Sequence, residues 1–233
     1  MKSKSYLKAF SLLILSLTIV LSGCQASTST PEQMNEPEPT KGIGTTYKIG
    51  FAPDVTGGGS FLGEPERNVA EIITNLLSES DGIVGPDGVR HPVEILIGDT
   101  ESNPDVAVSV ARRYIDEDKV VAVVAGSVTP ISLAIAEVAG ETKTPYISMA
   151  SSLAIVTTPD TGEIRPWVFK VAQSNGDVAA MQVMRVKTLG VTKVCYLYEN
   201  SGYGKDCFTS SSTALEKEGY QTVFSDSFER TDT

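Results

Sequence analysis

The sequence contains little cysteine, histidine or aromatic residue. Its 233 residues include 3 Cys, 1 His and 1 Trp, and aromatic side chains make up 7% of the chain. These counts are too small for a zinc site built from Cys and His alone, and too small for a fold held together by several disulfides. We therefore exclude zinc fingers and disulfide-rich scaffolds, and we predict neither a metal nor a cofactor.

Positive charge is also scarce. The chain has 19 Lys and Arg against 29 Asp and Glu, which gives a formal net charge of −10. Such a chain repels phosphate backbones, so we expect no nucleic-acid partner. The length is ample for a hydrophobic core and corresponds to one large domain or two small ones.

Residues 1–23 have the layout of a signal peptide. Lysines precede an uncharged run rich in Leu and Ile over residues 9–21, which is short for a membrane-spanning helix. The run ends in Leu21-Ser22-Gly23-Cys24, which resembles the bacterial lipobox. We expect Cys24 to be lipidated and to tether the protein outside the cytoplasmic membrane, at the cell surface or in the periplasm; the alternative is an ordinary cleaved signal with a free thiol.

The segment 24–45 is rich in Ser, Thr, Pro and Glu and has almost no apolar residues. Such a composition cannot bury enough surface to fold by itself. We predict that it is a disordered linker between the lipid anchor and the folded part.

From residue 46 the hydrophobic pattern alternates between strands and helices. The run 120–125 is continuously apolar, which indicates burial on both faces of a sheet. We predict an α/β lobe with a parallel sheet over residues 46–165. Its expected strands are 47–53, 93–98, 120–125 and 145–149, and apolar stripes at helical spacing cover 69–77, 107–115 and 131–139.

The same pattern restarts after a stretch that contains Pro and Gly. We predict that residues 166–233 begin a second α/β lobe, which lacks the strands to complete its own sheet. Its expected strands are 167–171, 193–198 and 220–225, and its expected helices are 176–189 and 205–218.

Motifs for nucleotide binding and catalysis fail in detail. The glycine-rich stretch around Gly57 lacks the third glycine of the dinucleotide fingerprint, and Glu64 stands where a Walker loop needs lysine. Ser127 is not part of a Gly-x-Ser-x-Gly elbow, and His91 sits in a polar turn where we expect it to be solvent-exposed. We predict that the protein is not an enzyme.

Acidic residues 99, 101 and 105 leave two interpretations open. They could work as an acid–base pair or bind a cation, but a strand end followed by helix capping explains them as well, and we favour capping.

Ligands of open α/β sheets bind beyond the carboxyl ends of the strands. Thr129 precedes Pro130 and is a predicted N-cap, and a helix N-terminus with hydroxyls can hold a carboxylate. Ser127, Ser151 and Ser152 supply further hydroxyls, which together suit a small zwitterion. The alternative is that these residues only form turns and caps.

Six short motifs occur in order along the chain. They are Lys48-Ile49-Gly50-Phe51, Thr56-Gly57 with Gly63, Asp99-Thr100 with Asn103-Pro104-Asp105, Val124-Ala125-Gly126-Ser127, Pro145-Tyr146-Ile147-Ser148 and Tyr203-Gly204-Lys205-Asp206. Over about residues 46–233 the chain thereby resembles the substrate-binding proteins for branched-chain amino acids of bacterial ABC transporters. The resemblance implies a type I periplasmic-binding-protein fold, in which two α/β lobes joined by hinge strands hold an amino acid between them.

The resemblance also implies roles for single residues. Thr129 matches the hydroxyl residue that holds the ligand carboxylate, Ala150 matches a residue that contributes backbone contacts, and Ser152 matches the next hydroxyl. Tyr203 matches the tyrosine of the second lobe that closes over the ligand. Leu62 stands where family members often carry an aromatic wall, which puts the side-chain preference of this protein in question.

The family further implies capture of a branched-chain amino acid or a small amide, and delivery to a permease with an ATPase subunit. A ligand-sensing domain of a signalling receptor is the alternative with the same fold. Family members continue well past Thr233, so we expect a fragment or a truncated gene product, with apolar faces of the second lobe exposed. Cys195 and Cys207 form either a disulfide or two small buried thiols.

Overall fold

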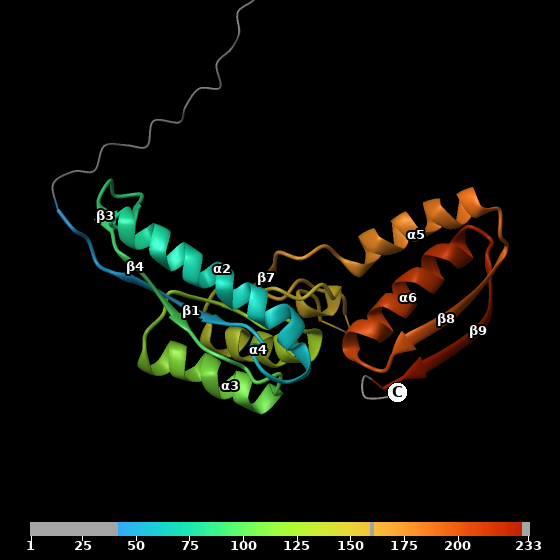
Figure 1. Cartoon of the computed structure of the whole chain (residues 1–233), viewed down its shortest axis with the longest axis horizontal. Helices are drawn as coiled ribbons and strands as arrows, with labels where there is room; N and C mark the ends of the chain where they lie inside the picture. Colours follow the sequence, from blue (N-terminus) through green and yellow to red (C-terminus); the bar gives the residue numbers. More distant parts are fainter. Residues whose placement is uncertain (1–41, 159–160, 230–233) are drawn as a thin grey trace, which may run out of the picture. The chain divides into compact units, whose positions relative to one another are not determined.

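The computed structural model describes residues 42–158 and 161–229 (Figure 1). All described residues belong to one compact unit. The predicted signal peptide, Cys24 and nearly all of the predicted linker lie outside the described residues. No helix in the described part of the chain combines the length and the apolar character needed to cross a bilayer.

A five-stranded parallel sheet is the centre of the first lobe. This confirms the predicted α/β fold class. The strand order is β4 (Val93–Ile97), β1 (Tyr47–Ala52), β5 (Ala122–Ala125), β6 (Tyr146–Ser148) and β7 (Val168–Lys170), and every neighbouring pair is parallel.

The outermost strand corrects the predicted lobe boundary. We expected residues 167–171 to open the second lobe, but β7 pairs with β6 at the edge of the first sheet, with Ile147 opposite Phe169. A strand of three residues carries no local signal for the sheet that it joins, so only the tertiary pairing could place it.

Helices cover both faces of this sheet (Figure 1). The helix α2 (Ser60–Glu79) lies on one face, whereas α3 (Pro104–Arg112) and α4 (Thr129–Thr142) pack against each other on the other. Asn103 is the N-cap of α3, and its side chain accepts hydrogen bonds from the N–H groups of residues 105 and 106. The helix continues as a π-helical turn over Arg113–Glu117.

The core lies between the sheet and the helices α3 and α4. Tyr114, Ile131, Ile135 and Tyr146 are at most 2% exposed. Tyr114 packs so closely on β1 that a Cβ atom at Gly50 would overlap its ring. A glycine at this strand position therefore lets the helix approach the sheet.

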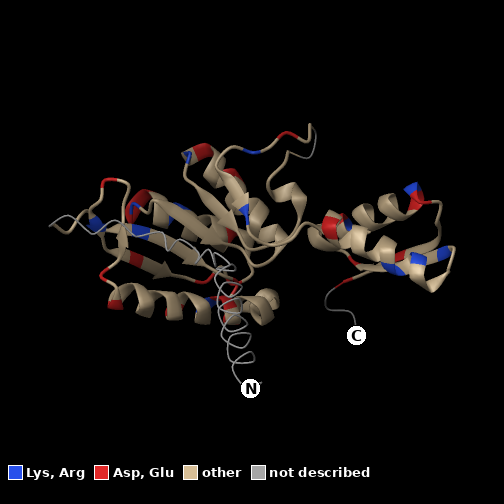
Figure 2. Ribbon diagram, turned by 90° about the horizontal axis from the view of Figure 1, so that it is seen from above, with Lys and Arg blue, Asp and Glu red and all other residues tan. Residues whose placement is uncertain are grey.

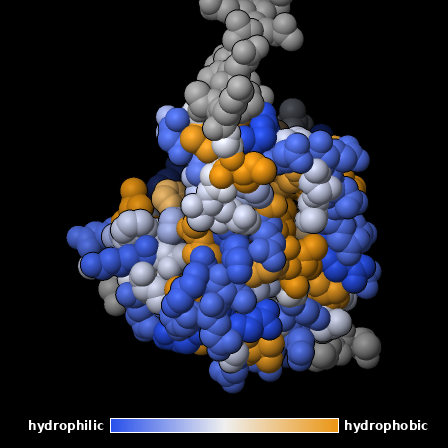
Figure 3. All heavy atoms as spheres, turned by 90° about the vertical axis from the view of Figure 1, so that its left-hand side faces the viewer, coloured by the Kyte–Doolittle hydropathy of each residue, from blue (hydrophilic) through white to orange (hydrophobic). Residues whose placement is uncertain are grey.

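The apolar stripe of α2 remains largely exposed. Its buried residues are Gly63 and Ala70, which are small enough for the helix to lie close to the strands. The larger stripe residues Ile72 and Leu76 are 59% and 58% exposed. Figure 3 shows hydrophobic residues reaching the surface among hydrophilic ones on the face that it presents.

The second lobe contains two parallel strands and two helices in the described residues. The strands β8 (Lys193–Glu199) and β9 (Gln221–Phe228) pair with each other, and α5 (Asn175–Leu189) packs on α6 (Gly202–Lys217). Apolar residues of the strands are exposed, among them Leu197, Val223 and Phe224. Cys195 and Cys207 are not bridged, and they are not the two buried thiols of the alternative either, because Cys195 is exposed and Cys207 is half-buried.

The prediction for His91 is wrong. His91 lies on β3 (Arg90–His91), which pairs with β2 (Ile83–Val84), and it is only 6% exposed. Its ring stacks on Tyr47, its Nδ1 lies 2.8 Å from the carbonyl oxygen of Thr45, and its Nε2 lies 3.1 Å from Asp87. The local sequence around His91 indicates a polar turn and does not predict these contacts, because Thr45 and Tyr47 are distant in sequence.

Candidate functional site

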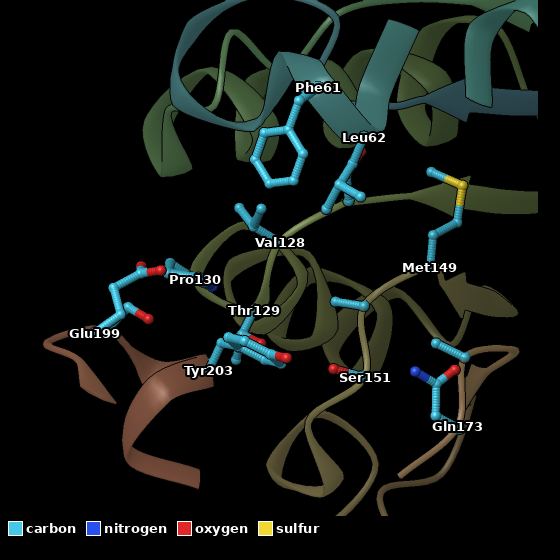
Figure 4. Close-up of a pocket in the computed structure, with 14 residues that line it drawn as sticks. Phe61, Leu62, Val128, Thr129, Pro130, Met149, Ser151, Gln173, Glu199 and Tyr203 are labelled. Atoms are coloured by element: carbon cyan, nitrogen blue, oxygen red, sulfur yellow. The ribbon is translucent and has the colours of Figure 1, made fainter. Parts of the chain in front are cut away.

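A cavity of about 320 Å³ lies at the carboxyl ends of the strands (Figure 4). Its wall combines the start of α2, the β5–α4 loop, the loop after β6, the segment before α5 and the β8–α6 loop. The lining residues are Phe61, Leu62, Ser127, Val128, Thr129, Pro130, Met149, Ala150, Ser151, Ala172, Gln173, Glu199, Ser201 and Tyr203.

Thr129 is the most informative residue of this cavity. It is 2% exposed, and its Oγ1 has no hydrogen-bond partner among the described residues. An unpaired buried hydroxyl is costly, so native structures rarely keep one without a reason. Thr129 lines the cavity, and its buried hydroxyl retains a hydrogen-bond donor that no described residue uses.

The start of α4 supplies a second feature for an anion. We predicted Thr129 as the N-cap, but the N-cap is Val128, and no side chain caps the helix. The chain turns into the helix one residue earlier than expected, which places Pro130 at the second helical position. The first N–H groups of a helix lack partners within the helix and carry positive partial charge, so they favour a carboxylate.

Ser127 is held by acidic residues behind the cavity. Its Oγ accepts the N–H of Asp54 at 2.9 Å and donates to Glu66 on α2. Asp54 is fully buried and in turn accepts the N–H of Val128 at 3.1 Å and the hydroxyl of Thr100. The β1–α2, β4–α3 and β5–α4 loops are thus joined at Asp54.

The three predicted positions after β6 behave differently. Ala150 and Ser151 line the cavity, and the N–H of Ala150 is already bonded to the Ser148 hydroxyl at 3.1 Å. Ser152 is fully buried and does not line the cavity; its hydroxyl accepts the N–H of Ala154 and caps the 3-10 turn η3 (Leu153–Ile155). The structure therefore favours capping at Ser152, the alternative that the sequence left open.

An apolar wall closes one side of the cavity. Leu62 lines it, and the neighbouring Phe61, for which the sequence suggested no role, also points into it (Figure 4). Val128 and Met149 complete this wall. Family members often carry an aromatic side chain at the position of Leu62, and in this chain Phe61 supplies an aromatic side chain one residue earlier. No local sequence pattern reveals this shift.

Polar residues line the opposite side. Tyr203 lines this side, together with Gln173, Glu199 and Ser201, for which the sequence suggested no role. Glu199 is the final residue of β8, so the strand-end rule that we applied to the first lobe could have found it. Among the described residues that line the cavity, it is the one with a formal charge.

The described residues hold no group of three or more His, Cys, Asp or Glu placed to bind a metal ion. Asp99 accepts hydrogen bonds from the N–H groups of Thr56 and Glu101 and from the Thr56 hydroxyl. Asp99 therefore links the loop after β1 to the loop after β4. Figure 2 shows Lys and Arg scattered among Asp and Glu over the described ribbon.

A parallel α/β lobe with a cavity at its strand ends defines a class of small-molecule binding modules. The sequence profile of the periplasmic binding protein family matches residues 46–233. The chain belongs to this family, as the resemblance predicted. A search of the curated protein sequences finds no match.

Solved structures agree with this assignment. An extracellular ligand-binding receptor from Rhodopseudomonas palustris HaA2 is 28% identical, with a TM-score of 0.67, over 80% of this chain and 48% of its own. A leucine-binding protein from Thermotoga maritima is 27% identical, with a TM-score of 0.66, over 80% of this chain and 50% of its own. A solute-binding protein of an ABC transporter from Rhodopseudomonas palustris, solved with 4-hydroxybenzoate, shares the fold at 23% identity, with a TM-score of 0.67, over 81% of this chain and 48% of its own. The chain spans about half the length of these relatives.

Proposed function

We propose that the chain is the ligand-binding part of an extracytoplasmic solute-binding lipoprotein, which captures a small amino acid of the branched-chain type for an ABC transporter. Its partners are a permease and an ATPase subunit, and Cys24 carries the lipid anchor. The signal-like N-terminus supports the location, and membership of the periplasmic binding protein family supports the role.

The single observation that carries the proposal is the unpartnered hydroxyl of Thr129 at the uncapped start of α4. Both features favour a ligand carboxylate, because the hydroxyl donates one hydrogen bond and the helix N–H groups donate others. The residues lining the cavity include no Lys, Arg or His in the described chain, so the carboxylate is held by neutral donors.

The remaining wall suits the rest of an amino acid. Phe61, Leu62 and Met149 present an apolar surface to a branched side chain, and Glu199 offers a carboxylate to an ammonium group. A cavity of about 320 Å³ lies at the lower end of the range for small-molecule sites. The leucine-binding relative from Thermotoga maritima supports the same choice.

Calorimetry with a matched set of ligands tests the proposal. We expect L-leucine to bind, L-leucinamide to bind at least tenfold more weakly because it lacks the carboxylate, and 4-methylpentanoate to bind more weakly because it lacks the ammonium group. Binding of 4-hydroxybenzoate with no binding of L-leucine would replace the amino acid by an aromatic carboxylate. Equal affinity for L-leucine and L-leucinamide would contradict the assignment of the carboxylate to Thr129 and α4.

A further inference from the structure

Two carboxyl groups lie behind the proposed carboxylate site without lining the cavity themselves. Glu66, on the second turn of α2, is half-buried and accepts the hydroxyl hydrogen of Ser127. Asp54 is 0% exposed and reaches the same loop through the N–H of Val128. A carboxylate ligand at the start of α4 would therefore meet two acidic groups just beyond Ser127.

The hydroxyl of Ser127 has only one hydrogen to donate. Its oxygen accepts the N–H of Asp54 at 2.9 Å, and its hydrogen points to Glu66 as long as Glu66 is ionised. A protonated Glu66 becomes a donor, and the Ser127 oxygen can accept this second hydrogen bond because a hydroxyl has two lone pairs. The Ser127 hydrogen is then free to turn toward the cavity that Ser127 lines.

The surroundings of both carboxyl groups raise their pKa values. Burial raises the pKa of Glu66, the negative charge of Asp54 raises it further, and the Ser127 hydrogen bond opposes the rise. Burial also raises the pKa of Asp54, against hydrogen bonds from Thr100 and from the backbone of residues 127 and 128, and the charge of Asp99 adds to the rise.

The groups that shift the pKa of Asp54 and Glu66 are acidic or neutral, and Arg67, which follows Glu66 on α2, is not among them. Asp99 faces Asp54 from the end of β4, the phenol of Tyr146 on β6 is fully buried near Asp54 and has a raised pKa, and Glu199 lines the cavity from β8. No Lys or Arg of the described residues is among the groups that shift the pKa of Asp54 or Glu66. A bound anion would add to this negative field and favour uptake of a proton.

We propose that Glu66 is a positioning residue for ligand capture: when it takes up a proton from solvent, it becomes a donor to Ser127 and releases the Ser127 hydroxyl to the ligand carboxylate. One proton enters from water, and no covalent bond of the ligand changes. This inference rests on the proposed function, since it needs a carboxylate ligand. It makes binding tighter at lower pH.

The test is the pH profile of L-leucine binding, measured by calorimetry between pH 5.5 and 8 on the full chain. The L-leucine carboxylate stays ionised over this range, so the ligand adds no carboxyl titration of its own. For the wild type we expect the dissociation constant to rise with pH, by at most about tenfold per unit above the pKa of Glu66. Titrations in two buffers of different ionisation heat should show uptake of up to about one proton for each ligand bound.

Three variants separate positioning from simple structural support. In Glu66→Gln the amide nitrogen can donate to Ser127 at every pH, so we expect affinity near the low-pH value of the wild type, a flat pH profile and no proton uptake at this position. In Ser127→Ala we expect weak binding and a flat profile. Glu64→Gln removes an exposed charge from the same helix and should keep the wild-type profile.

The outcomes distinguish this inference from the proposed function. Binding of L-leucine with the same pH slope in Glu66→Gln as in the wild type overturns the role of Glu66 and leaves the proposed function intact. Absence of binding by L-leucine and by 4-hydroxybenzoate at every pH overturns both. Melting temperatures of the ligand-free variants, measured at each pH, show whether each variant is folded.

Discussion

Replacement of Thr129 by valine should change stability and affinity in opposite directions. Thr129 is 2% exposed, and its Oγ1 has no partner among the described residues. The hydroxyl therefore weakens the empty protein, and it contributes to binding only when a ligand supplies the missing acceptor.

The magnitudes follow from hydrogen-bond energetics. A buried polar group without a partner costs about 1–3 kcal/mol, so Thr129→Val should raise the free energy of unfolding of the ligand-free chain by about 1 kcal/mol. For a domain of this size that corresponds to a melting temperature higher by roughly 2–4 °C. Loss of a hydrogen bond to a charged ligand group costs about 1.5–3 kcal/mol, which weakens L-leucine binding by about 10- to 150-fold.

Urea unfolding and calorimetry measure the two quantities. Thr100→Val is the matched control, because Thr100 is also a fully buried threonine but donates its hydroxyl hydrogen to Asp54. It should lower the free energy of unfolding by about 1–3 kcal/mol. An unchanged dissociation constant in Thr129→Val, or a loss of stability in the ligand-free form, would refute the reasoning.

Three further predictions concern the first lobe. Burial raises the pKa of Tyr114 from 10.0 to about 12. The contribution of Tyr114 to the free energy of unfolding should therefore be complete below about pH 10 and be lost as the pH rises toward 12. Urea unfolding at pH 9 and 11 should show this alkaline loss in the wild type and not in Tyr114→Phe. A hydrogen bond to a backbone carbonyl, together with a nearby carboxylate, raises the pKa of His91 above 6.5 against the effect of burial. His91 therefore stabilises fully below pH 6.5 and less as the pH rises through its raised pKa, and His91→Asn should flatten unfolding free energies between pH 6 and 9. Ile135→Ala should cost about 2–5 kcal/mol of unfolding free energy, whereas Ile72→Ala, at a side chain that is 59% exposed, should cost less than about 1 kcal/mol.

Hydrophobic periodicity predicted the elements of the fold well. The stripes over 107–115 and 131–139 fall on α3, its π-helical continuation and α4, and the continuous apolar run at 120–125 contains the buried central strand β5. These predictions succeeded because each depends on spacing within one element, which the chain order alone supplies. The strand-end rule likewise pointed to Ser127, Thr129 and the residues after β6 as a possible site.

Hydrogen-bond partners were beyond the reach of the sequence. Ser127 meets Asp54 across 73 residues and Glu66 across 61, and neither carboxyl group belongs to a recognisable motif with the serine. The polar turn around His91 suggested exposure, although Tyr47 and Thr45 bury it. Such contacts depend on which loops the sheet brings together.

The sequence by itself determined the α/β class, the order of strands and helices and the absence of intact nucleotide-binding and elbow motifs, since these follow from residue type and local spacing. Tertiary structure decided that β7 joins the first sheet, that Phe61 faces the cavity beside Leu62, and that the buried Thr129 hydroxyl has no partner among the described residues. The physical reason is that burial and hydrogen-bond pairing belong to neighbours in space, and the sheet makes neighbours of residues that lie far apart in the chain.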